Sequence, residues 1–240
     1  MTVTWKDRRG SVIPTGVATL VLVGGVAAWL GAAQAGGFEG AITMEDNSDD
    51  DITIQRYSFK GEKLRVDDVS AEAEGGAVIF DGRTREGFAV DSDEQAYVPF
   101  TWMDRTPEEL KQDAADSVVT RTGKRDKVAG RSCEIYLQRD KIDGSSSEYC
   151  IAKGLANSAL PGVINSDAVP TSPFPIWLVD MAKEGAFPLR GIDRTKAGRE
   201  VSRFEATKVE SKRLDDRLFT PPPGFTPLKM DDIGRGRVTR

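Results

Sequence analysis

The residue types that most often carry enzyme chemistry are scarce in this chain of 240 residues. It contains no histidine, which removes the commonest general base and the commonest zinc ligand. Any Ser–His or Cys–His nucleophile pair is therefore excluded. The carboxylate pairs Glu108-Glu109 and Asp215-Asp216 stand at an expected helix start and in a turn, where acidic residues have structural roles. We predict that the protein is not an enzyme and has no catalytic residue and no cofactor.

Two cysteines, Cys133 and Cys150, flank the stretch "EIYLQRDKIDGSSSEY". Its "DGSSS" centre is typical of a turn, and β-forming residues surround it. An even number of cysteines in an exported chain is typical of a disulfide, and the C-x-x-C spacing of redox pairs is absent. We predict a Cys133–Cys150 disulfide across a hairpin. Direct pairing of the cysteines would put Glu148 opposite Ile135, which indicates a bulge or a register offset.

The charges argue against metal ions and nucleic acid as partners. The acidic run "DNSDDD" lacks the glycine and the distal glutamate of a twelve-residue calcium loop, so we expect a solvated hairpin tip and no metal site. The net charge of the chain is −5, and the first 35 residues contribute three basic side chains and one acidic. The remainder is therefore acidic, whereas nucleic acid requires a concentrated basic face.

The first 35 residues have the three parts of a secretory signal. A basic start precedes an apolar run over residues 17–30, and "AQA" ends at Ala35. The alternative is an uncleaved membrane anchor, but the run is shorter than the roughly 20 residues of a spanning helix. We predict a signal peptide over residues 1–35, cleaved near Ala35, and a periplasmic or secreted protein without a stable membrane span. One domain should follow over 36–229, with a disordered tail over 230–240.

Alternating apolar and polar residues predict antiparallel strands over most of that domain. "FEGAITME" forms one short strand, and "DITIQRYSFKGEKLRVDD" forms two that are joined near Gly61. A meander of three strands covers "GGAVIFDGRTREGFAVDSDEQAYVPFTW", and "GREVSRFEATKVESKRL" forms a late strand. Residues 154–175 are expected to be an irregular connection. Such persistent alternation indicates one buried sheet face.

Two helices of different character should accompany the strands. "TPEELKQDAADSVV" has a capping box and a thin apolar stripe of Leu110, Ala114 and Val118, which predicts a lid-like helix. "SPFPIWLVDMAKEG" is apolar nearly all round, with one charged strip, which is typical of an enclosed helix. No second long apolar helix is evident to cover it. We predict a mainly β (α+β) fold, in which a curved antiparallel sheet forms an incomplete barrel that wraps the apolar helix.

Several short motifs, taken in order, resemble one known family. The matching positions are Lys63, Arg65, Tyr97, Ala129, Gly130, Cys133, Tyr136, Phe219, Pro222, Gly224 and Phe225. The chain resembles, over about residues 38–230, an exported bacterial domain-of-unknown-function family (DUF4412-like) of the lipoprotein-carrier (LolA/LolB/LppX-like) superfamily. Gln95 stands where that family usually has lysine. The resemblance implies an incomplete barrel around helices and, by analogy only, an apolar cavity for acyl chains.

Large apolar side chains near the two predicted helices are the candidates for ligand contact. They are Tyr97, Phe100, Trp102, Trp177, Leu178 and Met181. The alternative is that these side chains are ordinary core. Lys63 and Arg65 would form either a basic rim for an anionic head group or ordinary outward charges.

Two classes of function follow from this sequence. One is a periplasmic carrier or binding protein whose partner is a lipid or another apolar small molecule. The other is a structural or protein-interaction module of the cell envelope, with a core filled by its own helix and an envelope protein as partner.

Overall fold

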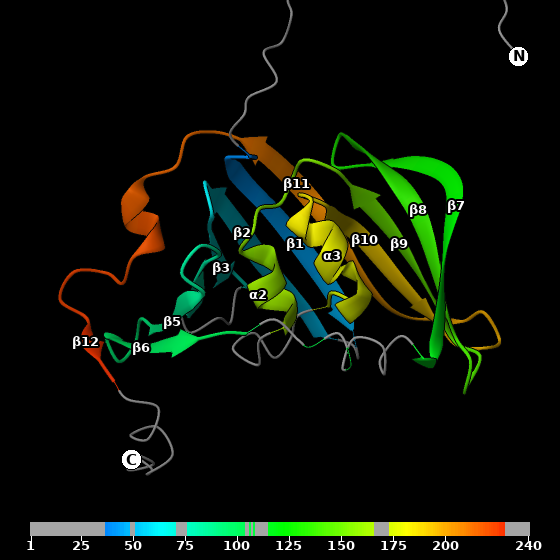
Figure 1. Ribbon diagram of the computed structural model, residues 1–240, viewed down its shortest axis with the longest axis horizontal. Helices are drawn as coiled ribbons and strands as arrows, with labels where there is room; N and C mark the ends of the chain where they lie inside the picture. The colour runs from blue at the N-terminus through cyan, green and yellow to red at the C-terminus, as the bar shows by residue number, and fades with distance from the viewer. Residues whose placement is uncertain are drawn as a thin grey trace, which may run out of the picture. The chain divides into compact units, whose positions relative to one another are not determined.

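The computed structural model describes residues 37–48, 51–70, 76–103, 106, 108, 115–165 and 173–228. The predicted signal peptide, the predicted C-terminal tail and most of the predicted lid helix, including Leu110 and Ala114, lie outside these residues. All of the described residues belong to one compact unit. Its described part contains a large sheet with short helices against one face (Figure 1).

Twelve strands form this sheet, in the spatial order β12-β6-β5-β4-β3-β2-β1-β11-β10-β9-β8-β7. Neighbouring strands are antiparallel except β12 and β6, which are parallel. The bounds are β1 (Gly40–Ser48), β2 (Asp51–Lys60), β3 (Lys63–Asp68), β4 (Ala77–Asp81), β5 (Glu86–Asp91), β6 (Ala96–Thr101), β7 (Ser117–Val128), β8 (Arg131–Asp140), β9 (Ser146–Ala152), β10 (Phe187–Arg194), β11 (Glu200–Ser211) and β12 (Thr226–Pro227). Because β12 and β7 stand at opposite ends of this order, the sheet is an incomplete barrel, as predicted.

The first six strands follow the predicted hairpins. Gly61, in the turn between β2 and β3, has a φ of +56°, a left-handed conformation that glycine adopts without steric cost. Phe59, Leu64 and Phe80 stand opposite one another on three adjacent strands. All three are fully buried, so this face of the sheet carries the main core.

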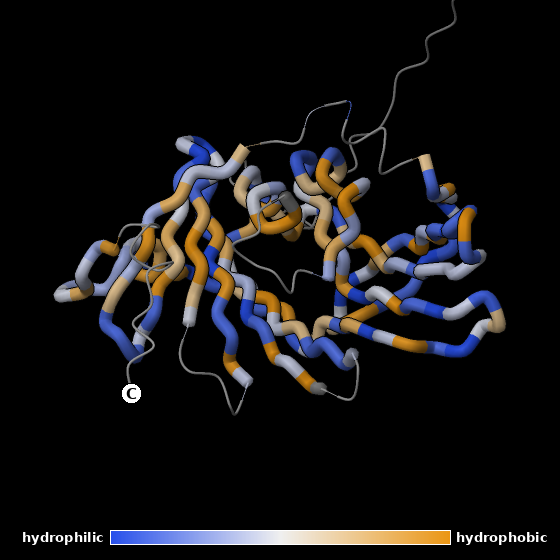
Figure 2. Tube along the Cα trace, turned by 90° about the horizontal axis from the view of Figure 1, so that it is seen from below, coloured by the Kyte–Doolittle hydropathy of each residue, from blue (hydrophilic) through white to orange (hydrophobic). Residues whose placement is uncertain are grey.

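The predicted apolar helix lies against the same face. It consists of a 3-10 turn, η1 (Ile176–Leu178), which continues directly into α3 (Val179–Lys183). Pro175 precedes η1, and Gly185 follows α3 with a φ of +85°, which is typical of a helix C-terminus. Figure 2 shows strands on more than one side of the helical segments, so the sheet curves around them.

The burial of this helix also follows the prediction. Leu178 and Ala182 have no exposed surface and belong to the main core. Asp180, Lys183 and Glu184 are exposed, and Lys183 Nζ lies 3.2 Å from Asp180 Oδ1. The charged strip therefore faces solvent, as predicted.

A second helix in the core corrects the prediction for residues 154–175. α2 (Leu160–Asn165) lies within the supposed irregular connection and packs against α3. Leu160 and Val163 are fully buried. A Cβ atom on Gly162 would lie 2.8 Å from the rings of both Phe80 and Trp102, so glycine permits the close approach of α2 to the sheet. The apolar helix is thus covered by α2 as well as by strands.

Three strands were not predicted, namely β7, β10 and the two-residue β12. β7 includes Val118, which is 48% exposed and opposite Arg139 of β8 rather than on the apolar stripe of a helix. β7 is mostly charged and polar, so it has little alternation of its own and is held by pairing with β8. β10 contains Pro188 and Gly191, which disfavour a strand in a sequence pattern.

Part of the opposite sheet face is buried as well, whereas the sequence predicted one buried face. A second cluster contains the fully or nearly buried Ala77, Ile79, Val90 and Phe219. Phe219 belongs to η2 (Asp216–Phe219), so the C-terminal segment covers the outer face of β4 and β5. Phe219, one of the positions that match the family, therefore anchors the C-terminal segment to the sheet.

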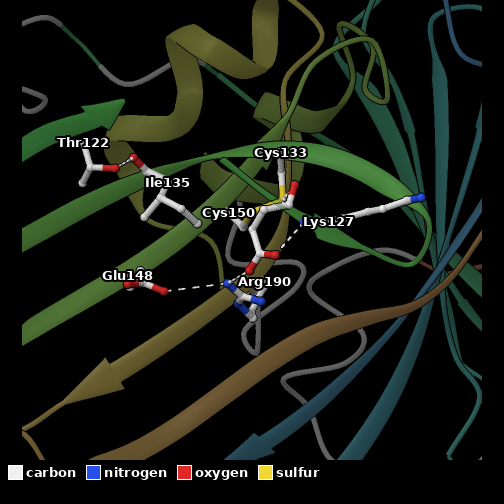
Figure 3. The surroundings of a disulfide bond; sticks show 8 residues. Thr122, Lys127, Cys133, Ile135, Glu148, Cys150 and Arg190 are labelled. Atoms are coloured by element: carbon white, nitrogen blue, oxygen red, sulfur yellow. Dashed lines mark hydrogen bonds and ion pairs between the residues drawn. A yellow bond between two sulfur atoms is a disulfide. The ribbon is translucent and has the colours of Figure 1, made fainter. Parts of the chain in front are cut away.

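The predicted disulfide is present and joins β8 to β9 (Figure 3). The Cα atoms of Cys133 and Cys150 are 5.3 Å apart. Cys150 stands opposite Ile135 in the ladder, and Glu148 stands opposite Leu137. The bond therefore runs diagonally, and this register offset resolves the mismatch that direct pairing of the cysteines would create.

Candidate functional site

A cavity of about 900 Å³ lies on the helix-bearing side of the sheet, at the end where β8 finishes and β9 begins. Five strands and the start of the helical segment contribute to it. Its apolar and aromatic lining consists of Val119, Tyr149, Pro175, Ile176, Trp177, Val179 and Val201. Ser145 of the β8–β9 turn, Ser146 and Ser147 at the start of β9, and Gln138 form much of its polar wall. This is the size and mixed character of a small-molecule site. We call it the Trp177 cavity.

Trp177 is held in this cavity by contacts with two neighbouring strands. Its ring centroid lies 5.6 Å from that of Tyr149 and 6.0 Å from that of Tyr136. Tyr136 and Tyr149 stand opposite each other in the β8–β9 ladder, so their rings emerge on one face. The indole Nε1 donates a 2.7 Å hydrogen bond to Gln138 Oε1.

Carboxylates outnumber cationic side chains around the Trp177 cavity. Its lining includes three carboxylates and two cations, namely Asp143, Asp180, Asp193, Arg194 and Lys196. Burial raises the pKa of the Tyr149 hydroxyl, and the charge of Asp193 raises it further. Burial also raises the pKa of Asp46, and Asp193 adds to this effect. This part of the sheet therefore disfavours additional negative charge.

A smaller cavity of about 300 Å³ lies near Met181. It is lined by Arg121, Arg125, Ser132, Cys133, Glu134, Tyr136, Ile151, Lys153 and Met181. Three of these side chains are cationic and one is a carboxylate. We call it the Met181 cavity, and its charge is opposite to that of the Trp177 cavity.

The six predicted ligand-contact residues occupy different places. Trp177 lines the Trp177 cavity and Met181 lines the smaller one. Leu178 is fully buried within the main core. The structure therefore brings Trp177 and Met181 to two adjacent cavities and assigns Leu178 to packing.

The remaining three predicted ligand-contact residues lie in β6 or just after it. Trp102 is 6% exposed and packs in the main core, and its Nε1 has no hydrogen-bond partner among the described residues. Phe100 packs on Phe80 with ring centroids 5.5 Å apart. Tyr97 packs on Phe88 beside the second cluster, on the outer face. These residues share no cavity with Trp177.

The basic rim considered for Lys63 and Arg65 is absent from both cavities. Arg65 Nη2 lies 2.6 Å from Asp67 Oδ1, and Arg65 Nη1 donates to the Leu218 carbonyl oxygen. Leu218 belongs to η2, which covers the outer face. Arg65 is thus an outward charge that helps to hold the C-terminal segment.

Sequence reasoning did not find most of the residues that line the two cavities. Gln138, Tyr149 and Asp193 come from three strands, and only the ladder register brings them together. The hairpin offset could have placed Tyr149 opposite Tyr136. No sequence signal indicated β10, which carries Asp193.

The chain belongs to the family described as "Domain of unknown function (DUF4412)", whose model matches residues 38–225. The predicted family is therefore confirmed. No curated protein matches the chain at a significant level.

Solved structures with low sequence identity are similar to this chain. An uncharacterized conserved protein from Thermus thermophilus has a TM-score of 0.47 and 11% identity, covering 79% of this chain and 88% of its own. MucB in the Pseudomonas aeruginosa MucA/MucB complex has a TM-score of 0.45 and 13% identity, covering 76% of this chain and 55% of its own. A DUF1329 family protein from Desulfovibrio piger has a TM-score of 0.22 and 11% identity, covering 76% of this chain and 90% of its own. The chain thus spans about half the length of MucB.

Two further observations concern the described residues only. None of their helices has the length and apolar character needed to cross a membrane. No group of three or more His, Cys, Asp or Glu side chains within the described ranges is arranged to hold a metal ion.

Proposed function

We propose that this protein is a non-enzymatic carrier or binding protein of the bacterial cell envelope, acting in the periplasm or outside the cell. Its ligand is a lipid or another molecule with a substantial apolar part. The observation that carries the proposal is the Trp177 cavity, in which an aromatic side chain is only half-buried beside about 900 Å³ of space. An aromatic wall with a few polar groups is the usual lining of a small-molecule site.

The family resemblance supports the same proposal, since it implies an apolar cavity in an incomplete barrel. The position of the observed cavity differs from the position that the family resemblance implies. The space between sheet and helices is filled by Tyr57, Phe59, Leu160, Leu178 and Phe187, which are fully buried. The proposed ligand therefore lies beside the helical segment, at its Trp177 end, and not in the centre of the barrel.

The filled core is also the observation that favours the second candidate function, a structural or protein-interaction module. In that case the Trp177 cavity holds no small molecule, and its exposed aromatic surface contacts an envelope protein. The two candidates differ in whether the purified protein binds an apolar small molecule.

Native mass spectrometry of exported protein, purified without detergent, tests the first candidate. We expect a non-covalently bound molecule or, in its absence, saturable binding of the neutral probe N-phenyl-1-naphthylamine. Trp177→Ala should weaken probe binding. Leu218→Ala should not, because Leu218 is exposed on η2 and lines neither cavity. A protein that carries no bound molecule and binds no probe would contradict the carrier function and favour the interaction module.

A further inference from the structure

We propose that the Met181 cavity is an anion site, which holds the phosphate or carboxylate group of an amphipathic ligand whose apolar part lies in the Trp177 cavity. The inference rests on the proposed function, because it concerns the polar end of the same ligand. It is carried by a bulge in β7, an excess of cations at one carboxylate, and the position of the cavity next to Trp177.

The bulge in β7 places two arginines together. Arg121 stands opposite Tyr136, and Arg125 stands opposite Glu134. Four steps along β7 thus match two steps along β8, and the register shifts between the arginines. Directly opposed residues share a sheet face, so both arginines are on the face that bears Tyr136. Bulges commonly redirect side chains in this way.

The cations at this point exceed the negative charge available to them. Arg121 donates two hydrogen bonds to the Glu134 carboxylate, at 2.6 and 2.8 Å. The hydrogen bond from Arg121 lowers the pKa of Glu134, and the charges of Arg125 and Lys153 lower it further. Within the described ranges, neither Arg125 nor Lys153 has an ion pair within 4.0 Å. One carboxylate therefore faces three cations, and two positive charges are left for a ligand.

The two cavities lie on either side of the contact between Trp177 and Tyr136. Tyr136 lines the smaller cavity, whereas Gln138, two residues further along β8, lines the larger one. Two residues on one strand face span about 7 Å. Met181 follows Trp177 by four residues and so shares its side of the helical segment. A ligand of modest length can therefore contact both cavities.

The charge distribution fixes the direction of such a ligand. Carboxylates outnumber cations around the Trp177 cavity, so an anionic group is disfavoured there. Cations outnumber carboxylates around the Met181 cavity, so the same group is favoured there. The apolar part then meets the aromatic rings of Trp177 and Tyr149.

Binding of three probes to the full-length exported protein tests this inference. The probes are dodecyl phosphate and dodecanol, both below their aggregation concentrations, and inorganic phosphate, measured by calorimetry or probe displacement. The double variant Arg125→Gln/Lys153→Gln removes the two surplus charges. The matched control Lys124→Gln/Lys127→Gln removes two exposed charges from β7 that do not line the cavity.

We expect dodecyl phosphate to bind the wild-type protein more tightly than dodecanol. The Arg125→Gln/Lys153→Gln variant should lose about tenfold or more in affinity for dodecyl phosphate, with dodecanol binding unchanged and the control variant unaffected. Equal losses of dodecyl phosphate affinity in the two double variants, or no loss in either, would overturn the anion site. The carrier function would still stand in that case if dodecanol binds. Inorganic phosphate that binds as tightly as dodecyl phosphate would overturn the inference that the anionic group belongs to an amphipathic ligand, because the alkyl chain would then add no affinity. Absence of binding by both dodecyl compounds would contradict the carrier function itself.

Discussion

The indole Nε1 of Trp177 and the amide oxygen of Gln138 are 2.7 Å apart, and this hydrogen bond ties the start of the helical segment to β8. Both residues line the larger cavity. The bond fixes the orientation of an aromatic ring that would otherwise be free to turn on a half-buried side chain. The cavity wall is therefore ordered before a ligand arrives, which lowers the entropic cost of binding.

A double-mutant cycle with Trp177→Phe and Gln138→Ala measures this bond. We expect a coupling free energy of about 1 kcal/mol, because Phe keeps the ring contacts with Tyr136 and Tyr149 but cannot donate the hydrogen bond. Urea unfolding of the four proteins provides the value. Single-variant effects that simply add would show that the bond contributes no stability.

Gly87→Ala should destabilise the β4–β5–β6 meander. A Cβ atom there would lie 2.3 Å from the ring of Phe100 and 2.7 Å from the Ile79 carbonyl oxygen. Such overpacking typically costs about 1–3 kcal/mol. Gly76→Ala is a suitable control, since its Cβ would lie 3.8 Å from the nearest atom. Similar melting temperatures for the two variants would contradict the observed packing of Phe100 on Gly87.

Reduction of the Cys133–Cys150 bond should lower the free energy of unfolding by about 3 kcal/mol, as expected when a loop of this length is no longer closed. The two residues are 17 positions apart. Thermal melts with and without reductant measure the effect, and Cys133→Ala/Cys150→Ala, which should not respond to reductant, is the control. Two alkylatable thiols in the native exported protein would contradict the presence of the bond.

Asp126→Asn should reduce stability at neutral pH but not in acid. Arg190 Nη2 lies 2.8 Å from Asp126 Oδ2, and this hydrogen bond lowers the pKa of Asp126 from its usual 3.8. The ionised carboxylate therefore stabilises the folded state above pH 3.8, and the effect is lost as pH falls through the lowered pKa. Melting temperatures of wild type and variant should differ at pH 7 and converge below pH 3.8. A difference that is independent of pH would contradict this account.

The strands with clear alternation could be predicted from the sequence, whereas those held by their neighbours could not. β3 alternates Leu64 and Val66 with charged residues, and its hairpin with β2 was predicted correctly. β7 is exposed along most of its length, so its sequence carries little signal for a strand. In α2, Pro161 and Gly162 suggest a loop, but Leu160 and Val163 bury enough apolar surface to hold the helix in the core.

The residues of the candidate site also separate into those that the sequence could predict and those that it could not. Trp177 was found because its neighbours form an unusually apolar helix. Arg125 and Lys153 were not found, since a charged residue in an edge strand, such as Arg125 in β7, or just after the end of a strand, such as Lys153 after β9, normally faces solvent. The proximity of Arg125 to Arg121 depends on a bulge, and neither the position of a bulge nor the register beyond it can be inferred from local residue types.

The bulge in β7 also affects how this protein meets other copies of itself. β7 is the last strand of the described sheet, and a long regular edge strand invites intermolecular pairing. The shift between Arg121 and Arg125 breaks the even spacing of the backbone groups along that edge, and Lys124 and Lys127 add exposed positive charge. A strand from a second molecule can therefore match only part of β7 before it loses register. The same irregularity that brings Arg121 and Arg125 to the lining of the Met181 cavity thus makes this edge of the sheet a poor template for self-association.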